Sequence, residues 1–294
     1  MKIKWQIYMT IKHILFGLLF CNYSIFCQVN VEQWKVFELT LKGPSAGNPF
    51  KDVKLSGNFV SDNDTVSVSG FYDGGGKYRI ITMPNRIGKW NYTTASNIKG
   101  LNNKNGSFIC EPAKRDNHGP VAVQDTFYFA HADGTPYYPF GTTCYAWVHQ
   151  GDSLAEVTLK TLSKGYFNKM RMCIFPKSYD WNINEPLYYP FEGTPLTDWD
   201  YSRLNPEFFR NIEKRIQQLD SLGIQADLIV FHPYDRWGFS KMDRATDDLY
   251  VNYIIARFAA YKNVWWSMAN EYDFMTEKTS DDWDHYIKLF SQND

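Results

Sequence analysis

The stretch FNKMRMCIF (residues 167–175) decides the fold of this 294-residue chain, together with ADLIVF (226–231) and VWWSMA (264–269). Each is a short, nearly continuous apolar run, as in strands that are buried on both faces. Segments with the apolar spacing of helices separate them, at 206–222 and 247–261. Alternating strands and helices predict a parallel sheet. Because the phosphate loops of doubly wound folds are missing, we expect the first half of a TIM (β/α)8 barrel.

The segments that precede these strands complete the expected half-barrel. Residues 122–130 indicate a short hairpin, 138–143 a first parallel strand and 154–162 a first helix. Residues 176–205 carry four prolines and predict a long loop, and such a loop inside a compact domain is usually functional. We therefore place the barrel portion at 122–294.

The N-terminal third has a different periodicity. Apolar and polar residues alternate along short segments that are separated by turn clusters, which predicts an antiparallel β-sandwich of immunoglobulin or fibronectin type at 28–113. A polar segment with Pro and Gly at 114–121 is expected to be a linker. The segments are 34–41, 53–60, 65–71, 78–83 and 88–94, and the turn clusters include 62–64, 73–76 and 102–106.

The first 27 residues have the pattern of a signal peptide. Lys2, Lys4 and Lys12 precede a short apolar run at 14–21, which is too short to span a bilayer comfortably. Cleavage is expected near Gln28, and lipidation of Cys21 or Cys27 is a weaker alternative. No later segment reads as transmembrane, so we expect export to the periplasm, the exterior or the outer surface.

Composition narrows the classes of partner. The net charge of −1 gives no field for nucleic acid, and no nucleic-acid motif is present. Cys110, Cys144 and Cys173 have neither the spacing of a disulfide framework nor that of a zinc site. We expect no metal and no cofactor. Aromatic residues make up 17% of the chain, which suits a sugar binder but also an ordinary core.

Polar and aromatic residues follow each predicted parallel strand, where the active site of a barrel lies. The sharpest case is Asn270-Glu271 after the fourth strand. Glycoside hydrolysis needs a carboxylic acid that protonates the leaving oxygen, and a carboxyl group at the end of an apolar strand has the low-dielectric surroundings that suit this role. We predict that Glu271 is the acid/base and that Asn270 binds a sugar hydroxyl. A surface or ion-paired glutamate is the alternative.

Three further polar residues at the strands are candidates. Arg171 lies within an apolar strand and should require a carboxylate partner, either to orient a catalytic carboxylate or as a structural ion pair. His232 is expected to donate to a sugar hydroxyl or to pack against backbone. Asp235 is a possible carboxylate, although a salt bridge with Arg236 is the more common arrangement in a loop.

Four aromatic residues after the strands could form stacking platforms for sugar rings, with core or loop packing as the alternative for each. They are Tyr145, Trp147, Tyr234 and Trp237.

Longer stretches resemble a known family. They are Asn117–Pro120, Ala132–Trp147, Phe167–Met172 and Phe231–Asp235, and together with Asn270-Glu271 they resemble glycoside hydrolase clan A, in particular the apiosidase-like (β/α)8 catalytic domain of Bacteroidetes. Asn48–Gly74 and Trp90–Tyr92 resemble the uncharacterised β-sandwich that precedes that domain.

The resemblance implies a secreted, retaining O-glycosidase acting on poly- or oligosaccharides. In the clan the glutamate after that asparagine is the acid/base, and the nucleophile is a second glutamate after strand seven. The segment from 122 onward is shorter than the roughly 250 residues of a whole barrel. We therefore expect a fragment that lacks the nucleophile and is inactive alone. A non-catalytic carbohydrate-binding or adhesion protein, or a pseudoenzyme, is the alternative.

Overall fold

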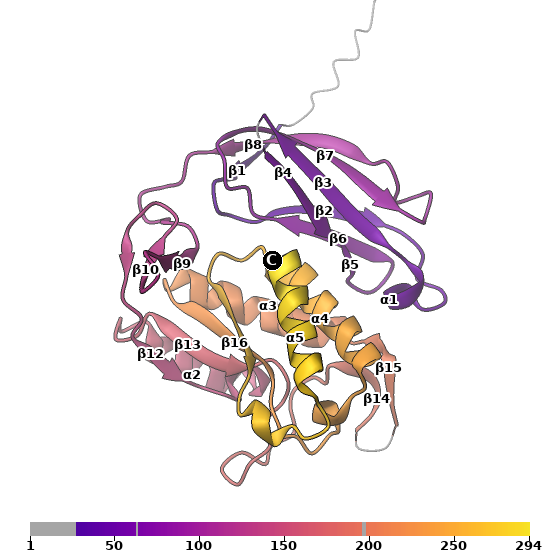
Figure 1. Ribbon diagram of the computed structural model, residues 1–294, viewed down its shortest axis with the longest axis vertical. Coiled ribbons are helices and arrows are strands. Elements are labelled where there is room, and N and C mark those ends of the chain that lie inside the picture. Colours follow the sequence, from indigo (N-terminus) through magenta and orange to yellow (C-terminus); the bar gives the residue numbers. More distant parts are fainter. Residues whose placement is uncertain (1–27, 63, 196–197) are drawn as a thin grey trace, which may run out of the picture.

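The computed structural model describes residues 28–62, 64–195 and 198–294. It contains a β-rich N-terminal module above a part with helices packed around a sheet (Figure 1). The expected signal peptide lies outside the described residues. Among the residues described, no helix has the length and apolar character needed to cross a membrane.

The N-terminal module, residues 29–111, is built from two sheets that share one apolar core. The first sheet has the order β1-β8-β7-β3-β4 and the second β2-β6-β5. Their strands are β1 (Val29–Glu32), β2 (Phe37–Lys42), β3 (Leu55–Ser61), β4 (Asp64–Ser69), β5 (Phe71–Tyr72), β6 (Lys77–Thr82), β7 (Gly88–Ser96) and β8 (Asn105–Glu111), with a short helix α1 (Pro49–Asp52). Phe59, Ile80, Trp90 and Phe108 are buried between the sheets, as alternating strands dictate.

Two features of this module differ from the sequence-based expectation. β1 pairs with β8 in parallel, so the first sheet is not wholly antiparallel. β8 begins at Asn105, inside a cluster that the sequence indicated as a turn. The turn ends before this residue, because the backbone N–H of Asn103 already donates to the Thr94 carbonyl.

The C-terminal part contains a four-stranded parallel sheet, with the order β12-β13-β16-β17. The strands are β12 (Gly141–Thr143), β13 (Lys169–Cys173), β16 (Gln225–Phe231) and β17 (Val264–Ala269), and the helices are α2 (Asp152–Leu162), α3 (Pro206–Ser221), α4 (Arg244–Phe258) and α5 (Ser280–Asn293). The register places Arg171 opposite both Thr143 and Asp227, and Asp227 opposite Trp265. The predicted alternation of strands and helices is therefore confirmed.

The two faces of this sheet differ in polarity. Met170 and Met172 belong to the same apolar core as Ile212 and Ile216 of α3. The side chains at the alternate strand positions point to the other face of the sheet, and several of them form polar contacts. Lys169 Nζ lies 2.5 Å from Asp227 Oδ2, and Ser267 Oγ donates to Asp227 Oδ1 at 2.6 Å. One face is thus covered by helices, and the other carries a hydrogen-bonded polar layer.

Two small sheets flank the parallel sheet. The segment predicted as a long loop contains an antiparallel hairpin, β14 (Phe191–Thr194) and β15 (Asp198–Leu204), which the irregular spacing of its apolar residues concealed. The predicted hairpin near 122–130 is extended by one strand, giving β9 (Val121–Gln124), β10 (Tyr128–His131) and β11 (Pro136–Tyr137). Trp265 contacts Phe129 and Tyr137, so this sheet packs at the amino-terminal end of β17.

The two parts of the chain are joined by a buried ion cluster made of Asp73, Arg79, Glu213 and Arg257. Arg79 of β6 donates to both carboxylate oxygens of Glu213 on α3, at 2.9 and 2.7 Å. Arg257 of α4 donates to Glu213 at 2.9 and 2.6 Å and to Asp73 at 2.7 Å. The Arg257 side chain is fully buried. The cluster fixes the β5–β6 edge of the module on α3 and α4.

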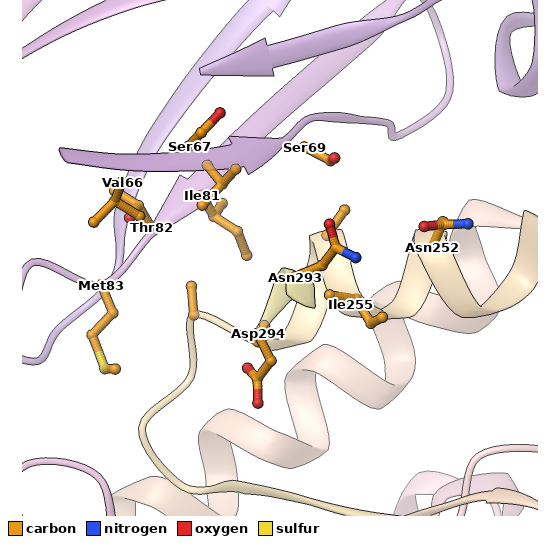
Figure 2. A pocket seen from close by; sticks show the side chains of 14 residues that line it. Val66, Ser67, Ser69, Ile81, Thr82, Met83, Asn252, Ile255, Asn293 and Asp294 are labelled. Carbon is orange, nitrogen blue, oxygen red and sulfur yellow. The ribbon is translucent and has the colours of Figure 1, made fainter. Parts of the chain in front are cut away.

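Beside this cluster the two parts leave a crevice of about 150 Å³. Figure 2 shows Ile81 of β6 on one side of the crevice, across from Asn252 and Ile255 of α4 and Asp294 at the end of α5. Trp266 Nε1 donates to Asp294 Oδ2 at 3.1 Å. The contact between module and helices is therefore tight at the ion cluster and looser beside it.

Removing the central carboxylate should destabilise the chain strongly. Glu213→Gln leaves two buried guanidinium groups without their charged partner, which costs about 3–5 kcal/mol in comparable sites. We expect a loss of this size in urea unfolding of residues 28–294. Arg86→Met is the control, because its ion pair with Asp64 is largely exposed and is worth about 1 kcal/mol or less. Equal effects of the two substitutions would contradict the importance of the cluster.

The ion cluster should also make stability depend on pH. Burial alone would raise the pKa of Glu213, but the hydrogen bond from Arg79 and the charge of Arg257 outweigh it and lower this pKa from 4.5 to about 2. A lowered carboxyl pKa stabilises the folded state fully above 4.5, and that contribution is lost as the pH falls toward 2. We expect the free energy of unfolding to fall more steeply in this window for the wild type than for Glu213→Gln. Parallel curves from urea titrations would contradict this.

Candidate active site

The carboxyl ends of the four parallel strands meet at one edge of the sheet, and Glu271 lies at this edge. β17 ends at Ala269, and the backbone N–H of Asn270 continues the pairing by donating to the Phe231 carbonyl at 3.0 Å. Asn270 is buried, whereas the side chain of Glu271 is exposed. The expected low-dielectric surroundings of Glu271 are thus not found: the strand ends two residues earlier, at Ala269, and the carboxyl group is open to solvent.

The backbone of Glu271 is left-handed, with φ 56° and ψ 57°. A non-glycine residue in this region costs on the order of 1–3 kcal/mol, and such residues cluster at functional sites. The conformation turns the chain sharply out of β17 into the short 3₁₀ helix Tyr272–Phe274. The strain is therefore an independent sign that the position of Glu271 matters.

A chain of hydrogen bonds orients the carboxyl group of Glu271. Tyr145, after β12, donates its hydroxyl to Asn270 Oδ1 at 3.1 Å, and Asn270 Nδ2 donates to Glu271 Oε2 at 2.9 Å. Tyr234, after β16, lies beside Glu271, and its interaction with this carboxylate raises the pKa of the Tyr234 phenol. The structure thus brings together Tyr145, Tyr234, Asn270 and Glu271 from the ends of three strands.

Lys177 belongs to the same group of residues but was overlooked in the sequence. It follows β13 by four positions, and its side chain is buried. Its ammonium nitrogen lies 3.9 Å from the centroid of the Tyr145 ring and 4.0 Å from that of Tyr234. Burial lowers the pKa of Lys177, and the negative charge of Glu271 opposes this effect. Its place directly after Phe175-Pro176, at a strand end, was the signal available in the sequence.

Arg171 does not have the carboxylate partner that the sequence predicted. Within the described residues it forms no ion pair, and its Nε atom is buried without a hydrogen-bond partner. The physical reason is the register: Asp227 lies opposite Arg171 on β16, but its two oxygens are taken by Lys169 and Ser267. Arg171 is half-buried on the strand that leads to Lys177.

His232 lies beneath the edge rather than on it. Its ring is 2% exposed, Nε2 lies 3.1 Å from the Phe175 carbonyl, and Nδ1 is buried without a partner. A second histidine, His149, is also buried and reaches the Cys173 carbonyl at 3.3 Å. Both rings support the backbone at the end of β13, so His232 as placed does not reach a sugar hydroxyl.

The four aromatic candidates divide into two pairs. Trp147 and Trp237 are 4% and 3% exposed, so the expectation that they offer faces to a sugar is wrong. Their rings pack in the core, and the indole N–H groups donate to Ala155 O and to Glu185. Tyr145 and Tyr234 are only partly buried and remain at the edge.

An open groove of about 630 Å³ runs beside Tyr145. Tyr179, Trp181 and Asn182 line it from the segment after β13, and Gln150 lines it from the segment after β12. Trp181 is 90% exposed and was missed in the sequence, because nothing in a loop pattern marks which aromatic residue faces outward. The groove offers flat aromatic surface next to the residues that orient Glu271.

Asp235 does not form the expected ion pair with Arg236. Its carboxylate accepts backbone N–H bonds from Trp237, Gly238 and Ser240, at 2.6, 3.1 and 2.6 Å. Arg236 pairs with Glu185 instead. The expected salt bridge is replaced by a loop closure around one carboxylate, which shapes the turn after β16.

The apiosidase-like catalytic domain family matches residues 123–293. The chain belongs to this family. A domain family of unknown function, DUF5060, matches residues 30–97. The solved structure of a proposed glycoside hydrolase from Bacteroides vulgatus ATCC 8482 is similar over 91% of this chain, with 48% identity and a TM-score of 0.88. The chain spans 54% of that structure's length.

More distant structures include a family 5 glycoside hydrolase from the same organism, with 14% identity over 60% of this chain and 37% of that chain, and a TM-score of 0.45. An endo-1,4-beta-mannanase from Rhizomucor miehei has 18% identity over 60% of this chain and 56% of that chain, with a TM-score of 0.36. No protein with a curated description matches the chain. The family match and the 48% identical structure from Bacteroides vulgatus, not these distant ones, make the chain a member of a glycosidase family, as its sequence predicted.

The two buried histidines should stay neutral at mildly acidic pH. Burial lowers the pKa of His232 from 6.5 to about 4 and that of His149 to about 3. A lowered histidine pKa contributes stability above 6.5, which is lost as the pH falls toward 4. We expect nitrogen-15 NMR of both rings to show neutral imidazole at about pH 5. A midpoint near 6.5 for either ring would contradict its burial.

Proposed function

We propose that this chain supplies the acid/base side of the active site of an exported, retaining O-glycosidase that hydrolyses poly- or oligosaccharides. The observation that carries the proposal is Glu271: an exposed carboxyl group at the end of a parallel strand, on a strained backbone, oriented by Asn270. In this proposal the four-stranded sheet is the first half of a (β/α)8 barrel, whose active sites lie at this end of the strands.

The surroundings of Glu271 suit the protonation of a glycosidic oxygen. The acid must be held in position while it remains accessible to the leaving group, and the bond from Asn270 leaves the carboxyl group exposed. In this proposal the second N–H of Asn270 Nδ2 donates to a sugar hydroxyl next to the cleaved bond. The faces of Tyr179 and Trp181 in the groove offer surfaces for the apolar faces of sugar rings.

A retaining mechanism requires a second carboxyl group about 5–5.5 Å from the first. Asp235 does not supply it, because its oxygens close the loop after β16. We assign the nucleophile to the strands that complete the barrel, which the greater length of the related Bacteroides vulgatus structure can accommodate. We further propose residues 1–27 as the export signal and 114–121 as the linker between the module and the barrel.

The decisive variant is Glu271→Gln, made in the full-length gene product. General acid/base catalysis contributes roughly 10²- to 10⁴-fold, so we expect a loss of this size in kcat/KM, which reports formation of the glycosyl-enzyme, on aryl glycosides with poor leaving groups. The loss should be much smaller for dinitrophenyl glycosides, which leave without protonation. A panel of substrate pairs measures both losses: each pair consists of an aryl glycoside with a poor leaving group and the dinitrophenyl glycoside of the same sugar, and the sugar differs from pair to pair.

Glu277→Gln is the matched control, because Glu277 is an exposed carboxyl group six residues away that accepts only from Thr276. It should keep the wild-type kcat/KM. A wild type that binds oligosaccharides in calorimetry but cleaves none of the panel would favour the carbohydrate-binding alternative. An equal loss for both classes of leaving group would remove Glu271 from the acid/base role.

A further inference from the structure

The ammonium group of Lys177 is clamped between the two tyrosines that serve Glu271. The faces of Tyr145 and Tyr234 lie 3.9 and 4.0 Å from Nζ, and the ring of Tyr179 lies 5.5 Å away. Aromatic faces attract cations through their quadrupole, and the attraction grows when the cation is desolvated. Lys177 is 7% exposed, so its contacts with the rings are largely shielded from water.

Each clamped ring ends in a hydroxyl near the acid/base pair. The Tyr145 hydroxyl donates to Asn270, which donates to Glu271, and the Tyr234 hydroxyl lies beside the Glu271 carboxylate. The two tyrosines come from different segments, after β12 and after β16, and Lys177 comes from the segment between them, after β13. One side chain therefore fixes two separate segments against the residues at the end of β17.

We propose that Lys177 is a positioning residue, which holds Tyr145 and Tyr234 so that their hydroxyls fix Asn270 and Glu271 for proton transfer. This inference rests on the proposed function for its catalytic meaning, but the clamp itself is a property of the fold. Lys177 does not touch the carboxyl group by any hydrogen bond or ion pair, so it acts through the rings.

The charges around Lys177 argue against a purely structural lysine. It has no ion-pair partner in the described part of the chain, and the nearby Arg171 repels it and lowers its pKa. A buried cation without a partner and beside a second cation is costly for the fold. Among the described residues, the groups that offset this cost are two aromatic ring faces and the negative charge of Glu271. Such a cost is expected where position serves activity rather than stability.

The test uses Lys177→Met, which keeps the length of the side chain and removes the charge. In the gene product labelled with carbon-13 at tyrosine Cζ, NMR follows the ionisation of Tyr234. If the clamp holds Tyr234 on Glu271, its loss lowers the pKa of Tyr234 toward the value in Glu271→Gln. If Lys177 acts only as a nearby charge, its removal raises the pKa of Tyr234, because a cation favours the phenolate.

Two further variants complete the experiment. Lys177→Arg keeps a cation that can contact aromatic faces, so it should retain the wild-type ionisation of Tyr234. Lys262→Met removes a largely buried lysine near the opposite end of β17 and should have no effect. A Tyr234 pKa that is unchanged or raised in Lys177→Met overturns the proposal, and one that is lowered supports it.

Kinetics provide the second readout. Lys177→Met should lower kcat/KM on the order of tenfold for aryl glycosides with poor leaving groups, with little change in kcat/KM for dinitrophenyl glycosides. An unchanged kcat/KM for poor leaving groups overturns the catalytic part of the inference. If the wild type cleaves no member of the panel, the proposed function fails, while the ionisation of Tyr234 still decides whether the clamp exists.

Discussion

Backbone hydrogen bonds hold Thr143, Arg171, Asp227 and Trp265 side by side on four parallel strands, and the position of every candidate site residue follows from this register. A slip by one residue would turn each side chain to the opposite face of the sheet. The polar layer of Lys169, Asp227 and Ser267 opposes such a slip, because its buried charges would lose their partners. The register then brings the segments that carry Tyr145, Lys177, Tyr234 and Glu271 to one edge.

The β module contributes to the same construction from outside the sheet. Its strand β6 supplies Arg79 to a carboxylate on α3, and α4 closes the cluster with Arg257. These two helices cover the apolar face of β13 and β16. The module is thus packed firmly against the C-terminal part of the chain and is not connected by a linker alone. Because the ion pairs of the cluster are buried, they specify one relative position of the two parts. The crevice in Figure 2 marks where that packing ends.

Local patterns in the sequence were sufficient for the parallel sheet. β17 was predicted with its observed bounds, and β16 and α3 within one residue at each end, because long apolar periodicity reflects burial directly. The pattern could not show the hairpin β14–β15, whose two strands pair with each other but lack the regular alternation of apolar and polar residues that marks a strand in a sequence. It also could not show that Trp147 and Trp237 turn inward, or that Asp227 is already paired and so unavailable to Arg171. Those outcomes depend on which residues meet in space, and Lys177 was missed for the same reason.

The claim on which this account depends is that Glu271 meets the oxygen of a glycosidic bond. A crystal structure of the Glu271→Gln gene product with an uncleaved oligosaccharide tests it most directly. The account predicts the glycosidic oxygen within about 2.6–3.2 Å of the side-chain amide that replaces the Glu271 carboxyl group, with sugar rings along the groove of Tyr179 and Trp181. A saccharide bound at the opposite end of the strands, with the substituted side chain facing empty solvent, would contradict it.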